Sequence, residues 1–216
     1  MLSFAEEIYL LALDDMTGQT VLAGGQIALN QALVAGVVGE LSFMRRLDAD
    51  LESLIVLDAS PTGNPILDTV LTPLRAAGLG PRPLRRCLDD LYRTASTIET
   101  LTREELVRKQ VIKSVAGRVF WVIPSRRYPV IDNRELIDVE RRLRAIVTDP
   151  EVIPDPRDTV LVSLVTACGL FPEILSPREL RRSQERIHQL SRLDLVGGSL
   201  IDHLNGLNLA MATASF

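Results

Sequence analysis

The segment 27–47 constrains the fold most, because it is typical of one long helix that is apolar on every side at its centre. The central run, LVAGVVG, leaves no polar face for water, and a helix of this kind belongs inside a hydrophobic core. Gly36 and Gly39 would let neighbouring helices approach closely, although each costs about 1 kcal/mol of helix propensity relative to alanine. The sequence therefore predicts a helical fold arranged around this segment.

Helix start signals predict further helices on both sides of the central one. Ser3 and Glu6 form a capping box in front of a helical run. Asn64 followed by Pro65 is typical of a helix N-terminus. The helix that begins at Pro65 is predicted to end near Gly78. Further helices are predicted at 102–115, behind a second capping box at Thr102, after Ser176, and at 84–93, 134–146, 158–168 and 200–213.

Strand signals are confined to two places. The segment 51–57 is a possible short strand, and 118–123 (RVFWVI) is the clearest one. The run PSRRYP at 124–129 predicts a turn, after which Val130 would begin a return strand. We therefore expect a mainly α fold, a single domain over 1–216 with one β-hairpin.

The composition excludes several classes of protein. A chain of 216 residues that is 46% hydrophobic is long enough to bury a full core and too apolar to be disordered. Cys87 and Cys168 stand far apart without a C-x-x-C, which excludes a disulfide framework, a zinc finger and a thioredoxin motif. The N-terminal run carries acidic residues where a secretory leader carries basic ones, and polar residues interrupt the uncharged stretch 16–39. We therefore expect a soluble, cytoplasmic protein.

The sequence offers little for catalysis. His188 and His203 are the only histidines, and their spacing matches no metal-binding motif. The chain has no G-x-S-x-G nucleophile motif and no glycine-rich phosphate-binding fingerprint. We therefore expect a protein that is not an enzyme and that uses no cofactor and no metal.

The charge is distributed unevenly along the chain. Residues 1–74 carry a net charge of −8, residues 75–146 carry +7, and residues 147–216 carry −3, for a total of −4. A basic middle third in an acidic protein predicts one positive face that suits an anionic partner. The alternative is that these arginines pair with nearby acidic residues on solvated helices.

The segment 102–130 allows three interpretations. Phe120 and Trp121, close to Arg126 and Arg127, are typical of a surface that meets the headgroups of an anionic bilayer. Alternatively, the hairpin packs on the core or forms a contact between copies of the chain. A basic helix followed by a hairpin tipped with Arg126 and Arg127 is also the arrangement of a winged-helix nucleic-acid binder, although the acidic total makes nucleic acid the least favoured partner.

Four segments of the chain match known patterns in a fixed order. The chain contains LSFAEEIYLLALDDMTGQT, a helix that ends GELSFMRRL, the run DASPTGNPILDTVL, and a long segment from RYPVIDNRELIDVERR to TACGLFPEIL. These are similar to L-x-x-x-E-E-hydrophobic-L-L-x-L-D-D-x-x-G, E-L-A-L-R-G-R-L, D-x-x-P-T-G-D-x-x-L-D-x-x-L, and a hairpin followed by P-x-x-R-D-x-x-L-x-x-L. The chain therefore resembles the Golgi phosphoprotein 3 (GPP34) family over nearly its whole length. The predominance of arginine over lysine favours a bacterial member.

The resemblance implies a non-catalytic, mostly helical fold in which amphipathic helices surround a central helix at 26–46 and a β-hairpin projects. It also implies binding of phosphatidylinositol 4-phosphate in a basic pocket, membrane contact or self-association through the hairpin, and an adaptor role toward client proteins. The family's pocket uses a Trp, an Arg and then two more Arg. At the matching positions this sequence has Gly25, Val34, Thr100 and Arg103, so one of the four residues is retained.

These observations combine into one hypothesis. We expect a non-enzymatic protein that associates peripherally with an anionic phospholipid or membrane surface, with possible client proteins and a possible homo-oligomer. The residues expected to contact the headgroup are Arg103, Arg108, Arg126 and Arg127, and those expected to insert into the membrane or to form a dimer are Phe120 and Trp121. The alternatives are an oligomeric scaffold that binds only proteins, and a winged-helix nucleic-acid binder.

Overall fold

The computed structural model describes residues 2–14, 19–22, 25–49, 52–113, 115–119, 123–127, 131 and 133–192. The fold is mainly α, as the sequence predicts. The helices are α1 (Phe4–Leu11), α2 (Gly25–Phe43), α3 (Pro65–Ala76), α4 (Leu84–Leu91), the 3₁₀ turn η1 (Tyr92–Thr94), α5 (Ala95–Arg108), α6 (Arg134–Thr148), α7 (Pro156–Ala167), α8 (Phe171–Ile174) and α9 (Pro177–Ser191). The strands are β1 (Leu47–Ala49), β2 (Ser53–Val56), β3 (Arg82–Pro83), β4 (Val115–Val119) and β5 (Ile123–Arg127).

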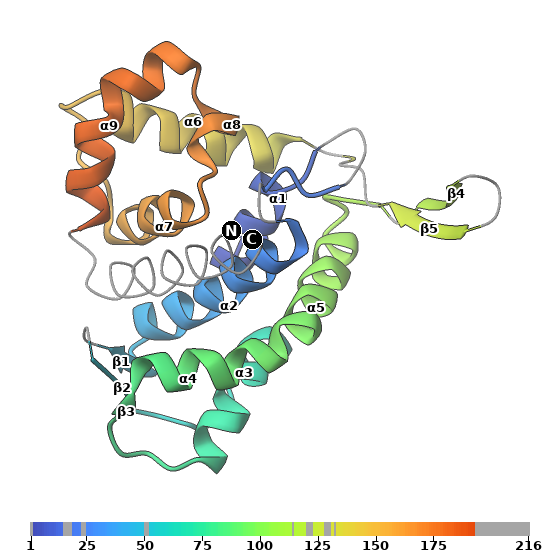
Figure 1. Cartoon of the computed structure of the whole chain (residues 1–216), viewed down its shortest axis with the longest axis vertical. Coiled ribbons are helices and arrows are strands. Elements are labelled where there is room, and N and C mark those ends of the chain that lie inside the picture. The colour runs from blue at the N-terminus through green and yellow to red at the C-terminus, as the bar shows by residue number, and fades with distance from the viewer. Residues whose placement is uncertain are drawn as a thin grey trace, which may run out of the picture.

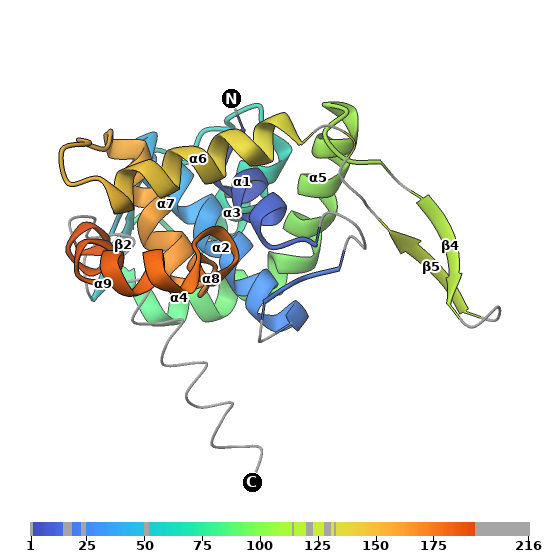
Figure 2. The same ribbon diagram turned by 90° about the horizontal axis from the view of Figure 1, so that it is seen from above.

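Helix α2 runs through the middle of the molecule, with α1, α3, α5 and α7 packed around it (Figures 1 and 2). Its middle, from Ala32 to Gly39, is buried on every side, which confirms the predicted central helix. The helix ends earlier than position 47, because Arg45 adopts a left-handed backbone conformation with φ of 55°. The N–H of Arg46 then donates to the carbonyl of Leu41, which closes the last turn.

The two glycines of α2 meet different neighbours. A Cβ atom at Gly36 would lie 3.0 Å from Cδ1 of Ile8 and 3.2 Å from the backbone nitrogen of Ala5, so α1 lies too close to admit a side chain there. A Cβ atom at Gly39 would meet only side chains, the nearest being Cγ1 of Val160 at 3.4 Å. The close approach of α1 to α2 therefore depends on Gly36.

The predicted helix starts are confirmed where a cap and a proline coincide. The side chain of Asn64 accepts a hydrogen bond from the N–H of Ile66, and Pro65 opens α3. Ser3 forms the predicted capping box at the N-terminus of α1, and Ser176, where a helix start was predicted, forms another at the N-terminus of α9. The predicted helix at 200–213 lies outside the described residues.

A small antiparallel sheet in the order β1-β2-β3 lies beside α4, at the lower end of the molecule in Figure 1. The predicted strand at 51–57 is confirmed as β2, and β1 and β3, which were not predicted, pair with it on either side. Leu47 pairs with Val56, and Leu54 pairs with Arg82. The flanking strands are three and two residues long, too short to show the alternation that identifies a strand in a sequence.

Helix α5 differs most from its prediction. It begins at Ala95 rather than at Thr102, and it ends at Arg108 rather than near 115. Thr102 is completely buried inside the helix, and its hydroxyl has no hydrogen-bond partner in the described part of the chain. A T-x-x-E pattern in mid-helix therefore imitated a capping box. Gln110, with φ of 60°, lies directly after the helix and ends it before position 115.

The second sheet is the predicted hairpin, formed by β4 and β5, but its turn is at a different place. Val119 pairs with Ile123, so residues 120–122 connect the strands, and the run predicted as a turn is strand β5 itself. Pro124 suggested a turn, yet a strand with one unpaired edge accommodates proline without losing a ladder hydrogen bond. Arg126 and Arg127 pair with Ala116 and Val115, at the end nearest the body. Their predicted position at the tip is therefore wrong.

The hairpin projects from the side of the helical body, beyond the helices (Figures 1 and 2). Phe120 and Trp121 lie outside the described residues, as do the side chains of Arg126 and Arg127. The strand register establishes only their order along the hairpin: positions 120 and 121 fall in the connection, and positions 126 and 127 fall near the body.

Candidate functional site

A cluster of charged side chains is buried at the N-terminal end of the molecule. Glu6 and Glu7 on α1 are only 2% and 3% exposed. Glu7 accepts hydrogen bonds from Arg142 of α6 at 2.7 Å and from Arg157 of α7 at 3.0 Å. Arg142 also donates to Asp158 at 2.7 Å. Charges this deeply buried are tolerated because each faces an opposite charge.

The same cluster extends to α2 and α5. Lys109, at the end of α5, donates to both carboxylate oxygens of Glu6, at 2.7 and 2.9 Å. Glu40 of α2 accepts from the N–H of Phe4 at 2.8 Å and lies 3.6 Å from Arg157. The buried ion cluster thus consists of Glu6, Glu7, Glu40, Lys109, Arg142, Arg157 and Asp158, and it connects α1, α2, α5, α6 and α7.

Arg157 has the largest number of different contacts in this cluster. Besides Glu7 and Glu40, its guanidinium donates to the carbonyl of Leu2 at 2.5 Å and lies 4.1 Å from the centre of the Phe4 ring. Burial raises the pKa of Glu7, against the opposing effects of Arg157 and Arg142. Burial is also the main reason why the pKa of Asp158 is raised. Glu6, Glu7 and Arg157 are buried and engaged by opposite charges, so we interpret the network as ion pairs that hold the helices together.

Sequence reasoning did not predict this cluster, although it contains the residues that carry the family resemblance. Glu6 and Glu7 are the acidic pair of the first motif, Glu40 belongs to GELSFMRRL, and Arg157 with Asp158 forms the R-D pair of the last motif. The available signal was a charged pair inside an otherwise apolar helix. Its partners lie up to 150 residues away in the chain, so spacing alone could not pair them.

The predicted headgroup residues on α5 already have acidic partners. Arg103 lies 3.3 Å from Glu99 of its own helix, and the amide of Gln26 on α2 donates to the same carboxylate at 2.8 Å. Arg108 makes two hydrogen bonds to Glu105, at 2.6 and 2.7 Å. The hydrogen bond from Arg108 is the main reason why the pKa of Glu105 is lowered. The predicted alternative, arginines paired with nearby acids, is therefore confirmed for both residues.

The other positions implied by the resemblance carry no charge. Gly25 has φ of 56° and no atom near its missing Cβ, Val34 is buried in the core, and the hydroxyl of Thr100 donates to the carbonyl of Ser96 at 2.9 Å. Of these four positions, only Arg103 carries a charge, and the carboxylate of Glu99 lies beside it. The side chains of Arg126 and Arg127 lie outside the described residues and cannot be added to this group.

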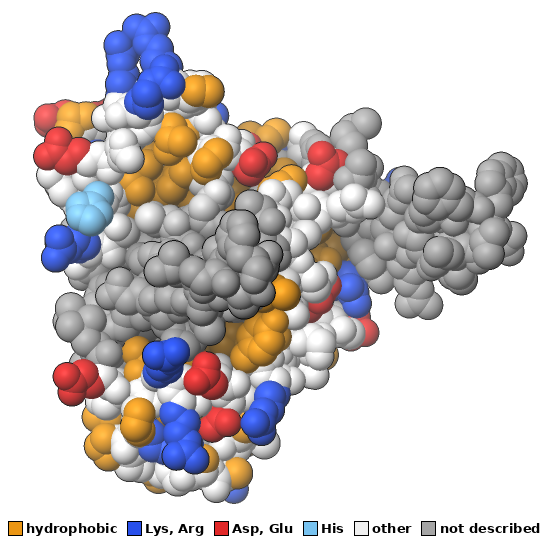
Figure 3. All heavy atoms as spheres, in the orientation of Figure 1, with side chains coloured by type: hydrophobic (Ala, Val, Ile, Leu, Met, Phe, Trp, Pro, Cys, Tyr) orange, Lys and Arg blue, Asp and Glu red, His pale blue; other side chains and the backbone are white. Residues whose placement is uncertain are grey.

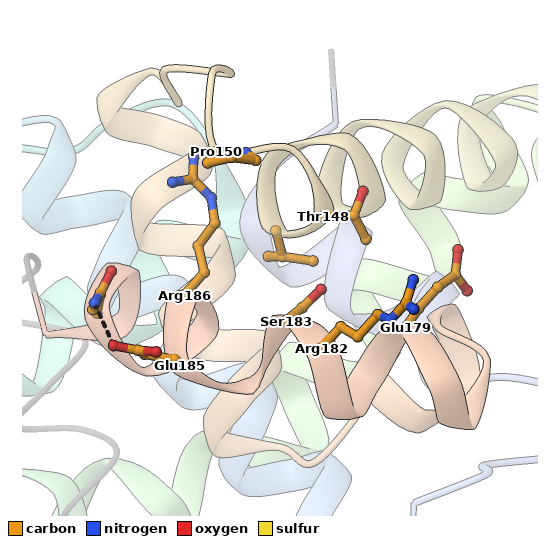
Figure 4. Close-up of a pocket in the computed structure, with 9 residues that line it drawn as sticks. Thr148, Pro150, Glu179, Arg182, Ser183, Glu185 and Arg186 are labelled. Carbon is orange, nitrogen blue, oxygen red and sulfur yellow. Dashed lines mark hydrogen bonds between the residues drawn. The ribbon is translucent and has the colours of Figure 1, made fainter.

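A hollow of about 490 Å³ lies between the end of α6 and α9 (Figure 4). Arg186 spans it and donates to the carbonyls of Ile146 and Val152, both at 2.6 Å. Arg182 and the carboxylates of Glu179 and Glu185 also line it. Both cations and anions line this hollow, so it lacks the uniform positive charge that binding of a phosphate group requires.

Among the described residues, no helix has the length and apolar character needed to cross a bilayer. Comparison with protein families matches residues 4–205 to Golgi phosphoprotein 3 (GPP34). The chain belongs to the GPP34 family. No curated protein matches the chain. For this GPP34 protein, the family match covers the buried ion cluster, the Arg103 site and the projecting hairpin together.

Proposed function

We propose that this GPP34 protein is a non-enzymatic, peripheral membrane protein of the cytoplasm that docks on anionic lipid through its β4–β5 hairpin. The observation that carries the proposal is the register of the hairpin. It gives the connection between the strands the sequence Phe-Trp-Val and sets Arg126 and Arg127 behind it, toward the body. An apolar end with cations behind it suits the boundary between acyl chains and phosphates.

The magnitude is sufficient for reversible binding. Each arginine near an acidic bilayer contributes about 1 kcal/mol, and burying an aromatic side chain adds roughly 1.5–3 kcal/mol. Arg118, Arg126 and Arg127 together with Phe120 and Trp121 therefore supply several kcal/mol, enough for a salt-dependent attachment. Family membership supports the same conclusion, as does the projection of the hairpin from the body (Figure 1).

Phosphatidylinositol 4-phosphate is the lipid that the resemblance implies, and Arg103 is the residue proposed to contact it. A phosphate group has to compete there with Glu99, which lies 3.3 Å from Arg103. One cation with a carboxylate beside it cannot hold a phosphate by several charge-assisted bonds. We therefore expect binding to acidic bilayers in general, without preference for this lipid at equal surface charge. An adaptor role toward client proteins at the membrane would follow from that attachment.

Co-sedimentation with vesicles tests the proposal. Neutral phosphatidylcholine vesicles are compared with vesicles that contain phosphatidylserine, and with vesicles that contain phosphatidylinositol 4-phosphate at the same total charge. Trp121→Ala and the double variant Arg126→Glu/Arg127→Glu are the test proteins. The matched control is Arg181→Glu/Arg182→Glu on α9, two adjacent exposed arginines without an ion pair in the described part of the chain.

We expect the parent to sediment with both acidic vesicles at low salt, and both hairpin variants to lose most of that binding while the α9 control retains it. No sedimentation with any acidic vesicle would contradict the proposal. In that case a stable oligomer in light scattering would favour the protein-only scaffold. Binding to duplex DNA that weakens steeply with salt would favour the winged-helix interpretation.

A further inference from the structure

One stretch with arginines and no acidic residue is folded into one corner of the molecule. Residues 69–88 contain four arginines and neither Asp nor Glu. The stretch forms the second half of α3, the loop 77–81, strand β3 and the first half of α4, at the lower end of the body in Figure 1. We call this surface the cationic corner and define it by Arg75, Leu79, Arg82, Arg85 and Arg86.

Within the described residues, the arginines of the cationic corner have no acidic ion-pair partner, which distinguishes them from Arg103 and Arg108 of α5. Arg75, Arg85 and Arg86 are exposed, and none of them forms an ion pair within the described part of the chain. Arg82 is half-buried, and its guanidinium is 3.5 Å from the carbonyl of Leu74, at the C-terminal end of α3. The positive face predicted from the charge distribution is therefore better represented here than at Arg103.

The acidic residues that flank the stretch are Asp68 and Asp89. The carboxylate of Asp68 accepts hydrogen bonds from the backbone N–H and the hydroxyl of Thr62, both at 2.8 Å, which directs it into the preceding loop. Asp89 follows Arg85 by one helical turn on α4 and also has a partner of its own. Asp90 lies next to Asp89, so four arginines are flanked by three carboxylates and the corner keeps a positive excess of one.

An apolar side chain stands among these cations. Leu79 is 57% exposed in a loop whose residues from Ala76 to Pro81 are all exposed. Gly78, with φ of 99°, gives the loop its sharp turn. The buried Leu74 and Leu84 anchor both sides of the loop in the core. In Figure 3, hydrophobic, basic and acidic side chains adjoin at this end of the molecule.

We propose that the cationic corner is a second contact with an acidic bilayer, in which Leu79 enters the headgroup layer and the arginines meet lipid phosphates. This inference rests on the proposed function, because a second contact presupposes that the protein reaches an acidic membrane. A single aliphatic tip with cations around it requires no shaped partner, which favours a bilayer over a folded protein as the occupant. The hairpin leaves the body on another side, so the two contacts can be removed separately (Figure 1).

Charge variants test the electrostatic part. Each arginine within reach of an acidic surface contributes about a fivefold factor to partitioning, so Arg85→Gln/Arg86→Gln is expected to lower the vesicle partition coefficient about 25-fold. The matched control is Arg181→Gln/Arg182→Gln, which removes the same charge from α9 at the other end of the body (Figure 1). At moderate salt the Debye length is about 10 Å, so the control is expected to change partitioning less than about threefold.

Fluorescence tests the insertion of Leu79. Trp121 is the only tryptophan, so Trp121→Phe provides a silent background into which Leu79→Trp is introduced. The matched control is Ile153→Trp in the same background, because Ile153 is 92% exposed in the loop before α7. With acidic vesicles that carry brominated acyl chains, we expect a blue shift and quenching at position 79 and neither at position 153.

The outcomes separate the two proposals. If the parent fails to bind acidic vesicles, both the proposed function and this inference are overturned. If the parent binds but the Arg85/Arg86 and Arg181/Arg182 variants lose affinity equally, only net charge matters and the cationic corner is not a contact. Absence of quenching at position 79 while the protein is bound likewise overturns the inference and leaves the hairpin proposal intact.

Discussion

Replacement of Arg157 by methionine is the sharpest test of the buried ion cluster. Methionine keeps most of the side-chain length and the contact with the Phe4 ring, but it removes the charge that faces Glu7 at 3.0 Å and Glu40 at 3.6 Å. Glu7 then keeps Arg142 as its one strong partner, and the carbonyl of Leu2 loses its donor. Breaking a buried ion pair in this way costs about 3–5 kcal/mol, because a charge stays buried without compensation.

Arg141→Met is the matched control. Arg141 pairs with Asp138 at 2.8 Å, yet its side chain is 77% exposed, and exposed pairs contribute about 0–1 kcal/mol. In urea denaturation the slope for small proteins is about 1–3 kcal/mol/M, so Arg157→Met should lower the midpoint by at least about 1 M. Arg141→Met should leave it nearly unchanged.

A pH comparison distinguishes charge from packing. Removing the cation raises the pKa of Glu7 further, so the variant can lower its cost by protonating that carboxyl. The difference in stability between Arg157→Met and the parent should therefore be smaller at pH near 5 than at pH near 8. A difference that does not depend on pH, or equal losses in Arg157→Met and Arg141→Met, would refute the account of the cluster.

Three further predictions concern packing, titration and the α5 site. Gly36→Ala should lower the free energy of unfolding by about 1–3 kcal/mol, because the added Cβ meets the backbone of α1. Gly39→Ala should leave the free energy of unfolding unchanged or raise it by up to about 1 kcal/mol. Calorimetric melting temperatures that fall equally in both variants would contradict this. Burial raises the pKa of Glu7 above its ordinary value. Between the ordinary and the raised pKa, the folded state binds more protons than the unfolded state, so the contribution of Glu7 to stability falls as the pH rises. In Glu7→Gln, the urea midpoint should therefore decline less steeply with pH. Glu99→Gln removes the carboxylate beside Arg103 and should increase binding to acidic vesicles; unchanged binding would contradict a competition between Glu99 and lipid phosphate.

The fold was predictable where local chemistry decides it. Asn64 with Pro65 and the capping box at Ser176 fix helix starts through atoms only a few residues apart, and a sequence shows such contacts directly. The same local pattern failed at Thr102, where the surrounding core, rather than the cap, determines that the helix continues. The prediction of the hairpin turn was wrong for a similar reason, because Pro124 is compatible with either a turn or an edge strand.

The site was less predictable, because its partners are distant in the chain. The contact of Glu7 with Arg157 joins residues 150 positions apart, and only the tertiary fold brings them together. The pairing of Arg103 with Glu99 is different. It spans a single helical turn, so the spacing of four already indicated that the arginine was not free.

The central claim is that the β4–β5 hairpin enters an acidic bilayer, and the single tryptophan of the chain reports on it directly. Trp121 lies in the connection between the two strands. Because it is the only tryptophan, its emission can be recorded in the unmodified protein. We predict a blue shift, and quenching by brominated acyl chains, when phosphatidylserine vesicles are added, with no change for neutral vesicles. Emission that stays constant while the protein sediments with the same acidic vesicles would contradict the account, because it would show that the membrane is bound by another surface.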